Sequence, residues 1–220
     1  MIRLVIATRN AHKIEEIRTI LGSTFEYLTL LDLSGAPEAV EDAPTFEGNA
    51  AKKAATLARW LSSQNHADTL VLADDSGLEV DALNGAPGVH SARFAALDDP
   101  AFAPGKNSPD CPNNDKLLRL LAKVPEAKRG ARFRCALALI AVPTSPTSVD
   151  KLAATARFFS GACEGRIAFA PSGSGGFGYD PLFIPVGHER SFAELGEDVK
   201  NRMSHRGNAL EQLRKYLATT

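Results

Sequence analysis

Two adjacent carboxylates, Asp74 and Asp75, stand between an apolar run at 70–73 and the residues Ser76 and Gly77. Successive side chains of a strand point to opposite faces, so only one of the two aspartates can face a given cleft. A carboxylate placed there can bind a hard cation or activate a water molecule. The alternative is a polar hairpin turn, because Asp, Ser and Gly favour turns. The aspartates alone leave both interpretations open.

The segment from Thr8 to Lys13 follows the apolar run 4–6, where a strand is expected to become a helix. Free backbone N–H groups and the helix dipole favour an anion at such a position. Thr8 and Asn10 add hydrogen-bond donors, and Lys13 adds a positive charge. The alternative is an ordinary helix start with Asn10 as N-cap and Lys13 in solvent. Taken alone, this segment favours that alternative.

The glycine-rich run 173–180 lets the backbone approach a ligand closely. Within it, Phe177 offers a face for stacking a nucleobase, and Asp180 offers a hydrogen-bond acceptor. The alternative is a flexible linker, but flexible linkers are usually rich in Gly and Ser without aromatic residues. The composition therefore favours a binding loop.

Charged residues in two further places could join a polar site. Lys200, His205 and Arg206 flank the start of the last expected helix, where they bind an anion or are merely solvated. Glu41 and Asp42 are loop acids or a second source of a carboxylate for a metal. Lys52 and Lys53 lie on an expected helix and reach either an anionic substrate or only water.

Length, composition and charge restrict the possible classes of protein. The 220 residues fit one substantial α/β domain or two small ones. A net charge of −1 gives no support for broad binding to nucleic acid or to a membrane surface. No run approaches the roughly 18 apolar residues of a spanning helix, and the N-terminus lacks the features of a signal peptide. Three widely spaced cysteines predict neither a disulfide framework nor a zinc site, so we expect a cytoplasmic protein.

Hydrophobic periodicity predicts alternating strands and helices, which favour an α/β domain around a mixed sheet. Strands are expected at 3–8, 25–31, 70–73, 78–80, 89–94, 131–142, 153–163, 165–169 and 181–185. Helices are expected from about 10 to 22, 46 to 61, 113 to 121 and 205 to 217. The two strands at 131–163 are expected to form an antiparallel second lobe, with a cleft between lobes. Segments 95–113 and 143–150 are expected to be surface loops.

Taken together, phosphate-directed donors, one aromatic stacking surface and an acidic turn suited to Mg²⁺ predict a site for a nucleoside polyphosphate. The chain resembles the inosine triphosphate pyrophosphatase family, also called the XTP/dITP diphosphatase family. Six motifs carry the resemblance in the same order: Thr8-x-Asn10-x-x-Lys13, Thr45-Phe-Glu-Gly-Asn-Ala50, Ala73-Asp-Asp-Ser-Gly-Leu78, Gly85-Ala-Pro-Gly88 with Ser91-Ala-Arg93, Gly175-Gly-Phe-Gly-Tyr-Asp180 and Ser204-His-Arg-Gly207.

The resemblance implies an enzyme that hydrolyses ITP, dITP, XTP and dXTP to the monophosphate and pyrophosphate with Mg²⁺. It implies one elongated α/β domain over 1–220, with a central mixed twisted sheet flanked by helices and an active-site cleft between two lobes. It also implies a homodimer. Asp75 would be the general base and a metal ligand, assisted by Glu41, although the choice between Glu41 and Asp42 stays open. The implied substrate-binding residues are Thr8, Arg9, Asn10, Ala11, His12, Lys13, Ser76, Phe177, Gly178, Tyr179, Asp180, Lys200, His205 and Arg206.

Selection of the purine is expected to depend on position 6 of the base. Hypoxanthine and xanthine carry an acceptor there, so donors such as His205 and Arg206 would leave the amino group of adenine unpaired. Two alternatives are a nucleotide-binding module without catalysis and a pyrophosphatase for other modified or normal dNTPs. The expected partner is a purine nucleoside triphosphate, with no nucleic acid and no membrane.

Overall fold

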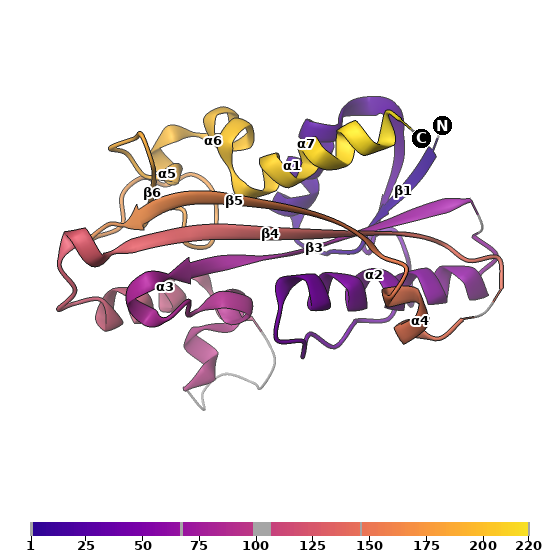
Figure 1. Cartoon of the computed structure of the whole chain (residues 1–220), viewed down its shortest axis with the longest axis horizontal. Coiled ribbons are helices and arrows are strands. Elements are labelled where there is room, and N and C mark those ends of the chain that lie inside the picture. The colour runs from indigo at the N-terminus through magenta and orange to yellow at the C-terminus, as the bar shows by residue number, and fades with distance from the viewer. Residues whose placement is uncertain (1, 67, 99–106, 146, 220) are drawn as a thin grey trace. The chain divides into compact units, whose positions relative to one another are not determined.

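A computed structural model describes residues 2–66, 68–98, 107–145 and 147–219. Its strands form one six-stranded sheet in the order β2-β1-β3-β4-β5-β6, flanked by helices (Figure 1). β1 pairs in parallel with β2 and β3, whereas β5 and β6 are antiparallel, so the predicted mixed sheet of an α/β fold is confirmed. The strands are β1 Ile2–Ile6, β2 Phe25–Thr29, β3 Thr69–Val80, β4 Gly130–Ala141, β5 Arg157–Ile167 and β6 Phe183–Pro185.

The helices begin and end at residues that suit their termini. Asn10 caps the first helix by accepting from the Lys13 amide, and Thr45 caps the second by accepting from the Gly48 amide. The α-helices are α1 Ala11–Leu21, α2 Phe46–Ser63, α3 Asp110–Leu120, α4 Val149–Ala153, α5 Phe192–Leu195, α6 Glu197–Met203 and α7 His205–Leu217. Short 3₁₀ turns lie at η1 Gly22–Thr24, η2 Asp81–Leu83, η3 Gly88–Arg93, η4 Ala95–Leu97 and η5 Glu126–Lys128. No helix in the described ranges is long and apolar enough to cross a membrane.

The chain divides into two compact units. Unit 1 comprises Met1–Asp75, Cys135–Gly161 and Arg206–Thr220, and unit 2 comprises Ser76–Arg134 and Ala162–His205. The residues of β4 and β5 are therefore shared between the units, so the expectation that the two strands at 131–163 would form the second lobe is wrong. The boundary between the two units falls within the long strands β3, β4 and β5.

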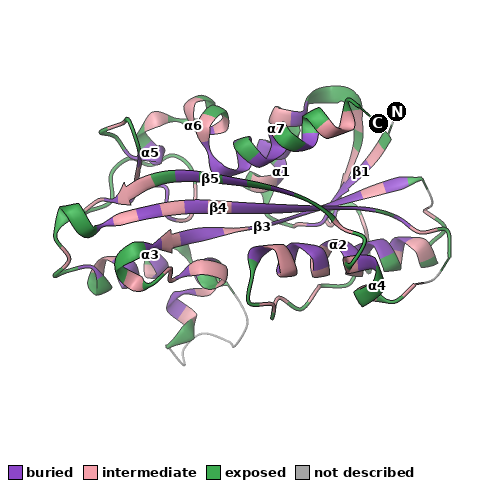
Figure 2. Ribbon diagram, viewed as in Figure 1, coloured by how far each residue is buried: buried purple, intermediate pink, exposed green. Residues whose placement is uncertain are grey.

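Unit 1 buries both faces of its part of the sheet. Strand alternation sends Leu4 and Leu72 into a cluster with apolar residues of α1 and α7, such as Ile17. The intervening residues Val5 and Val71 enter a second cluster with α2 and α4. In Figure 1, α1 and α7 accordingly cover one face and α2 the other, and the strands between them are largely buried in Figure 2. Consecutive β3 residues must therefore reach different helices.

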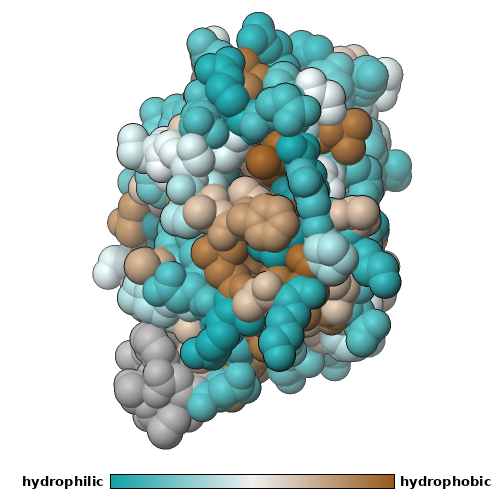
Figure 3. Space-filling view, turned by 90° about the vertical axis from the view of Figure 1, so that its left-hand side faces the viewer, coloured by the Kyte–Doolittle hydropathy of each residue, from teal (hydrophilic) through white to brown (hydrophobic). Residues whose placement is uncertain are grey.

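Unit 2 has its own apolar core. Phe133 on β4 contacts the rings of Phe183 and Phe192 at centroid distances of 4.7 and 6.2 Å. Large apolar side chains also reach its surface, and Phe169 and Val186 are both exposed. Figure 3 shows apolar side chains gathered among hydrophilic ones on one face of the molecule.

The acidic pair does not lie in a turn. The expectation of two strands at 70–73 and 78–80 around a hairpin turn is wrong, because β3 runs without interruption through Thr69–Val80. β3 lies between β1 and β4 in the sheet, and Asp74 and Asp75 are only 2% and 6% exposed. The place of β3 within the sheet therefore overrides the turn preference of Asp, Ser and Gly.

Other expected elements shift or change type. The segment 89–94, expected to be extended, lies in a 3₁₀ turn, and the strand expected from 153 begins at Arg157, because Ser148 caps α4 before it. The expected strand at 165–169 is the end of β5. α3 starts at Asp110, earlier than predicted and inside the expected loop 95–113. Residues 99–106 of that loop and residue 146 of the loop at 143–150 lie outside the described residues.

Candidate functional site

The two aspartates of β3 contact different helices. Asp74 reaches α1 and α7, and Asp75 reaches α2. This confirms that strand geometry allows only one of them to face a given side. We use the name aspartate cluster for Asp74, Asp75 and the charged side chains around them, which are Lys13, Glu41, Lys53 and Arg206. All of these residues belong to unit 1.

Asp75 shares a lysine with the predicted metal-assisting acid. Lys53 Nζ lies 2.7 Å from Asp75 Oδ1 and 3.0 Å from Glu41 Oε2. Asn49, one turn earlier on α2, donates from Nδ2 to Asp75 Oδ2 over 3.2 Å. The Asn49 side chain is itself held, because its Oδ1 accepts from the Ala43 amide over 2.9 Å. Both oxygens of Asp75 therefore have a donor from α2.

The environment of Asp75 favours a basic carboxylate. Burial raises the pKa of Asp75, and the charges of Lys53 and Lys13 offset only part of that rise. Burial also works against the charge on Lys53, but Asp75 and Glu41 outweigh it and raise the pKa of Lys53. Lys53 therefore stays a cation beside a carboxylate that binds a proton more readily than usual.

Asp74 has the opposite character. Arg206 Nε donates to Asp74 Oδ2 over 2.8 Å, and Lys13 donates to the other carboxylate oxygen. Cys135 Sγ lies 3.3 Å from Asp74 Oδ2. Burial disfavours the charge on Asp74, but Arg206 and Lys13 outweigh it and hold its pKa well below its usual range. Asp74 is thus a permanent anion that holds two cations.

Arg206, predicted to bind substrate, is only 1% exposed and donates to Glu16 of α1 as well as to Asp74. The segment 8–13, taken alone, predicts that Lys13 is solvated. Instead, Lys13 pairs with Asp74, and its side chain is only 16% exposed. Asn10 is an N-cap, as that alternative predicted. The other residues of the segment lie near the surface: Thr8 is half-buried, Arg9 pairs with Glu38, and Ala11 and His12 are exposed.

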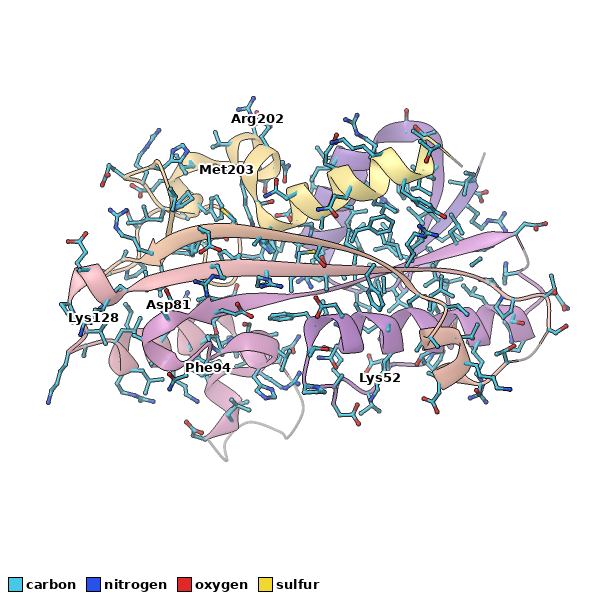
Figure 4. All side chains as sticks on the ribbon, in the orientation of Figure 1. Lys52, Asp81, Phe94, Lys128, Arg202 and Met203 are labelled. Carbon is cyan, nitrogen blue, oxygen red and sulfur yellow. The ribbon has the colours of Figure 1, made fainter. Side chains whose placement is uncertain are left out.

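The donor set of the aspartate cluster fits a magnesium ion. Mg²⁺ is usually held by one or two carboxylates, substrate phosphates and water. Asp75 and Glu41 supply two carboxylates, and both already contact the Lys53 ammonium. Asp42 instead pairs with Lys52, which Figure 4 labels on α2, so the geometry favours Glu41 over Asp42. In the described part of the chain, no group of three or more His, Cys, Asp or Glu side chains is arranged to hold a metal ion.

Unit 2 holds a second group of predicted residues around the loop 175–180. Lys200 Nζ lies 2.7 Å from Asp180 Oδ2, and this oxygen also accepts from the Phe177 amide over 2.8 Å. The Lys200 ammonium lies 4.3 Å from the centroid of the Phe177 ring. These contacts argue against a flexible linker. The loop presents one half-buried aromatic ring beside a fixed ion pair.

Of the remaining predicted residues of unit 2, two are buried and two are half-buried. His205 stacks on Phe133 at a centroid distance of 4.8 Å and an interplanar angle of 14°. Tyr179 donates its hydroxyl to the Ser91 carbonyl over 2.9 Å, and burial raises the pKa of that hydroxyl. Ser76 and Gly178 are half-buried. The structure thus collects Phe177, Asp180 and Lys200 directly, with His205 against the core of the same unit.

Sequence reasoning did not identify the partners of several residues that complete these groups. Asn49 and Lys53 are spaced i,i+4, so they lie on one side of α2, and this spacing could have indicated a common partner. Glu16 also lies on α1, three residues after Lys13, but no pattern in the sequence connects it to Arg206, 190 residues later. Long-range pairs of this kind depend on tertiary structure alone.

Comparison with known proteins agrees with the motifs. Residues 4–216 match the Ham1 family. A dITP/XTP pyrophosphatase of Opitutus terrae is 43% identical, covering 97% of this chain and 98% of its own length. Another, of Shouchella clausii, is 44% identical, covering 99% and 97%. A solved HAM1 protein from Coxiella burnetii superposes with a TM-score of 0.79 at 36% identity, covering 100% of both chains. The Staphylococcus aureus Ham1 protein gives 0.78 at 33% identity, covering 99% and 98%. The chain therefore belongs to the Ham1 family.

Proposed function

We propose that this chain hydrolyses noncanonical purine nucleoside triphosphates, dITP, ITP, XTP and dXTP, to the monophosphate and pyrophosphate. Such an enzyme removes deaminated purines from the nucleotide pool. One observation carries the proposal: Asp75 and Glu41 converge on one cation, in a chain that aligns over nearly its whole length with relatives named dITP/XTP pyrophosphatase.

Asp75 is the proposed general base. Its raised pKa suits a group that must accept a proton near neutral pH. It would take a proton from water as the water oxygen bonds to phosphorus. The bond between the α-phosphate and the β-phosphate would break, and pyrophosphate would leave. Asn49 and Lys53 fix both carboxylate oxygens, so the base is oriented before substrate arrives.

Phosphoryl chemistry of this kind depends mainly on positioning and neutralisation of charge. Lys13, held by Asp74 at the start of α1, and Lys53 are the proposed protein cations for the phosphates. Thr8, Arg9, Asn10, Ala11 and His12 line the same helix start. Asp75 and Glu41 would hold Mg²⁺, which would neutralise phosphate charge and lower the pKa of a bound water.

The proposed base-binding residues lie in unit 2. The Phe177 ring would stack on the purine, and Lys200 places a donor 4.3 Å from the centroid of that ring. Ser76, Gly178, Tyr179, Asp180 and His205 complete the proposed substrate set. Because Arg206 already donates to Asp74 and Glu16, we assign it to positioning Asp74, and its contact with nucleotide stays a prediction.

The wider organisation is also proposed. We infer one pyrophosphatase domain over residues 1–220, acting as a cytoplasmic homodimer with Mg²⁺. The elongated form and the cleft between lobes stay predictions. The only proposed partners are the purine nucleotide and a second copy of the chain.

The test is pyrophosphate release from ITP, dITP, XTP, GTP and ATP with Mg²⁺, in the wild type, Asp75→Asn and the surface control Asp42→Asn. Turnover of the first three substrates, abolished in Asp75→Asn and kept in Asp42→Asn, is expected. Equal turnover of GTP and ATP would instead favour a pyrophosphatase for normal nucleotides. Binding of ITP without any release would favour a nucleotide-binding module.

A further inference from the structure

The loop that carries Phe177 needs an external restraint. Gly176 and Gly178 both have positive φ angles, 71° and 63°. At Gly176 a Cβ would also meet Asp180 Oδ2 at 2.2 Å, so a side chain is excluded there. Glycines that permit such conformations also permit many others, because they have no side chain to limit φ and ψ. The direction of the Phe177 ring therefore depends on what fixes the peptides beside it.

Two side chains of α3 hold both polar groups of Gly178. Asp110 Oδ2 accepts from the Gly178 amide over 2.7 Å. Asn114 Nδ2 donates to the Gly178 carbonyl over 3.1 Å. Asp110 and Asn114 are spaced i,i+4, so one side of one helix supplies both partners. We call this pair of hydrogen bonds the Gly178 clasp.

The residues on either side of Gly178 are held by other contacts. Asp180 accepts from the Phe177 amide and from Lys200, which fixes the backbone before Gly178 and the cation beside the ring. Tyr179, after Gly178, is tied to the Ser91 carbonyl. Gly178 lies between these two contacts, and the clasp supplies the hydrogen bonds that join its own amide and carbonyl to α3. All of these residues belong to unit 2.

Asn114 has a buried amide oxygen that does not contribute to the stability of the fold. Its amide oxygen Oδ1 is buried and has no hydrogen-bond partner among the described residues. A buried unpaired acceptor disfavours folding, and an apolar side chain of similar size would avoid that cost. The amide is therefore better explained by its donor, which reaches Gly178, than by its contribution to the core.

We propose that Asp110 and Asn114 are positioning residues that hold the Gly178 peptide so that the Phe177 ring meets the purine base. They act through Phe177 and do not touch the reacting phosphates. The inference rests on the proposed function, because it assigns the base-stacking role to Phe177. It adds α3, which no sequence motif singled out, to the elements that determine nucleotide affinity.

The test compares Asp110→Ala, Asp110→Asn, Asn114→Leu and the control Asp115→Ala, an exposed acid on the same helix. KM and kcat for ITP and the thermal midpoint are measured for each. Asp110→Ala and Asn114→Leu are expected to raise KM roughly 3- to 30-fold, in line with loss of one hydrogen bond, with kcat changed less than about twofold. Asp110→Asn keeps an acceptor oxygen and should stay near wild type, as should Asp115→Ala.

The thermal midpoint separates positioning from a structural role. Asn114→Leu removes the unpaired acceptor but also leaves the Gly178 carbonyl without its donor, so the two effects offset and its midpoint should stay near that of wild type while its KM rises. An unchanged KM in Asp110→Ala and Asn114→Leu would overturn the inference, as would a KM rise matched by loss of stability in both. If wild type fails to turn over ITP, the proposed function fails first, and the inference falls with it.

Discussion

The Lys53 ammonium lies 2.7 Å from Asp75 Oδ1, on the α2 side of the sheet. Burial raises the pKa of Asp75, and this contact offsets part of the rise. Burial alone would raise the pKa of Asp75 further, and the Lys53 charge is the largest influence that opposes it. Glu41 contacts the same ammonium and keeps it charged. The three groups therefore place two carboxylates on one ammonium, with a net charge of −1 when all three are ionised.

Replacement of Lys53 by methionine should raise the pKa of Asp75, because the carboxylate loses its nearest positive charge. The base form would then be lost at a higher pH, so the acid limb of the kcat/KM profile should move to higher pH. At neutral pH kcat/KM should fall about 10- to 100-fold, as expected for loss of one hydrogen bond to a charged group. The measurement is a pH profile with dITP.

Lys52→Met is the matched control for that experiment. Lys52 is the adjacent residue of α2, but it pairs with Asp42 at the surface. Exposed ion pairs contribute little, so its profile should overlay that of wild type. Equal shifts in Lys52→Met and Lys53→Met would mean that general charge, and not the contact with Asp75, sets the acid limb.

The sequence predicted most helices because their signals are local. Asn10 acts as the N-cap of α1 where predicted, and α2 begins at the predicted position, Phe46, with Thr45 as its cap. β3 could not be predicted as one strand, because its Asp-Asp-Ser-Gly centre favours a turn and only the place of β3 within the sheet overrides that preference. The continuous strand depends on neighbouring strands that are far away in the sequence, so local sequence signals could not reveal it.

The site was predictable where a motif carries the chemistry, and not where the chemistry depends on a partner. Asp75 and Glu41 were named from sequence, and the structure brings them to one lysine. The partners of Arg206 could not be named, because an arginine beside a helix start is equally consistent with a phosphate ligand. Its enclosure by Asp74 and Glu16 is visible only in three dimensions.

Asp74→Asn should destabilise the protein more than a surface change would. It leaves Arg206 and Lys13 without their shared carboxylate, and breaking a buried ion pair typically costs about 3–5 kcal/mol. Urea unfolding at pH 7 should show that loss as a lower midpoint. Asp42→Asn, which removes an exposed partner, should change the unfolding free energy by at most about 1 kcal/mol. Equal midpoints for the two variants would contradict the role of Asp74.

The same comparison has a defined pH dependence. The pKa of Asp74 is depressed in the folded state, so its stabilisation is present above the unfolded value of about 3.9 and is lost as pH falls toward the folded value. The difference in unfolding free energy between wild type and Asp74→Asn should therefore be constant near neutral pH and shrink below about pH 4. A difference that grows on acidification would contradict the depressed pKa.

Arg129→Met should also be strongly destabilising, for a different reason. The buried guanidinium donates to the backbone carbonyls of Leu121, Ile167 and Ala168 over 2.8–2.9 Å. The Leu121 carbonyl still accepts from the Val124 amide, but the Ile167 and Ala168 carbonyls lose the guanidinium donor, at about 1–3 kcal/mol for each carbonyl left unpaired. We expect a clearly lower urea midpoint with an unchanged m-value. Arg119→Met, at an exposed position on α3, is the control and should unfold like wild type.

The three cysteines should differ in reactivity as their burial differs. Cys111 is exposed, whereas Cys135 and Cys163 are buried. Burial raises the pKa of the Cys163 thiol to about 11. The neutral thiol therefore stabilises the fold fully below the unfolded pKa of about 8.5, and this contribution is lost as pH rises through the folded value. At about pH 8 a disulfide reagent such as DTNB should titrate only Cys111 in the native protein, because thiolate is the reactive form. All three thiols should react in urea, and Cys111→Ser should abolish the fast native reaction. Rapid reaction of a second thiol in the folded protein would contradict the burial of Cys135 and Cys163.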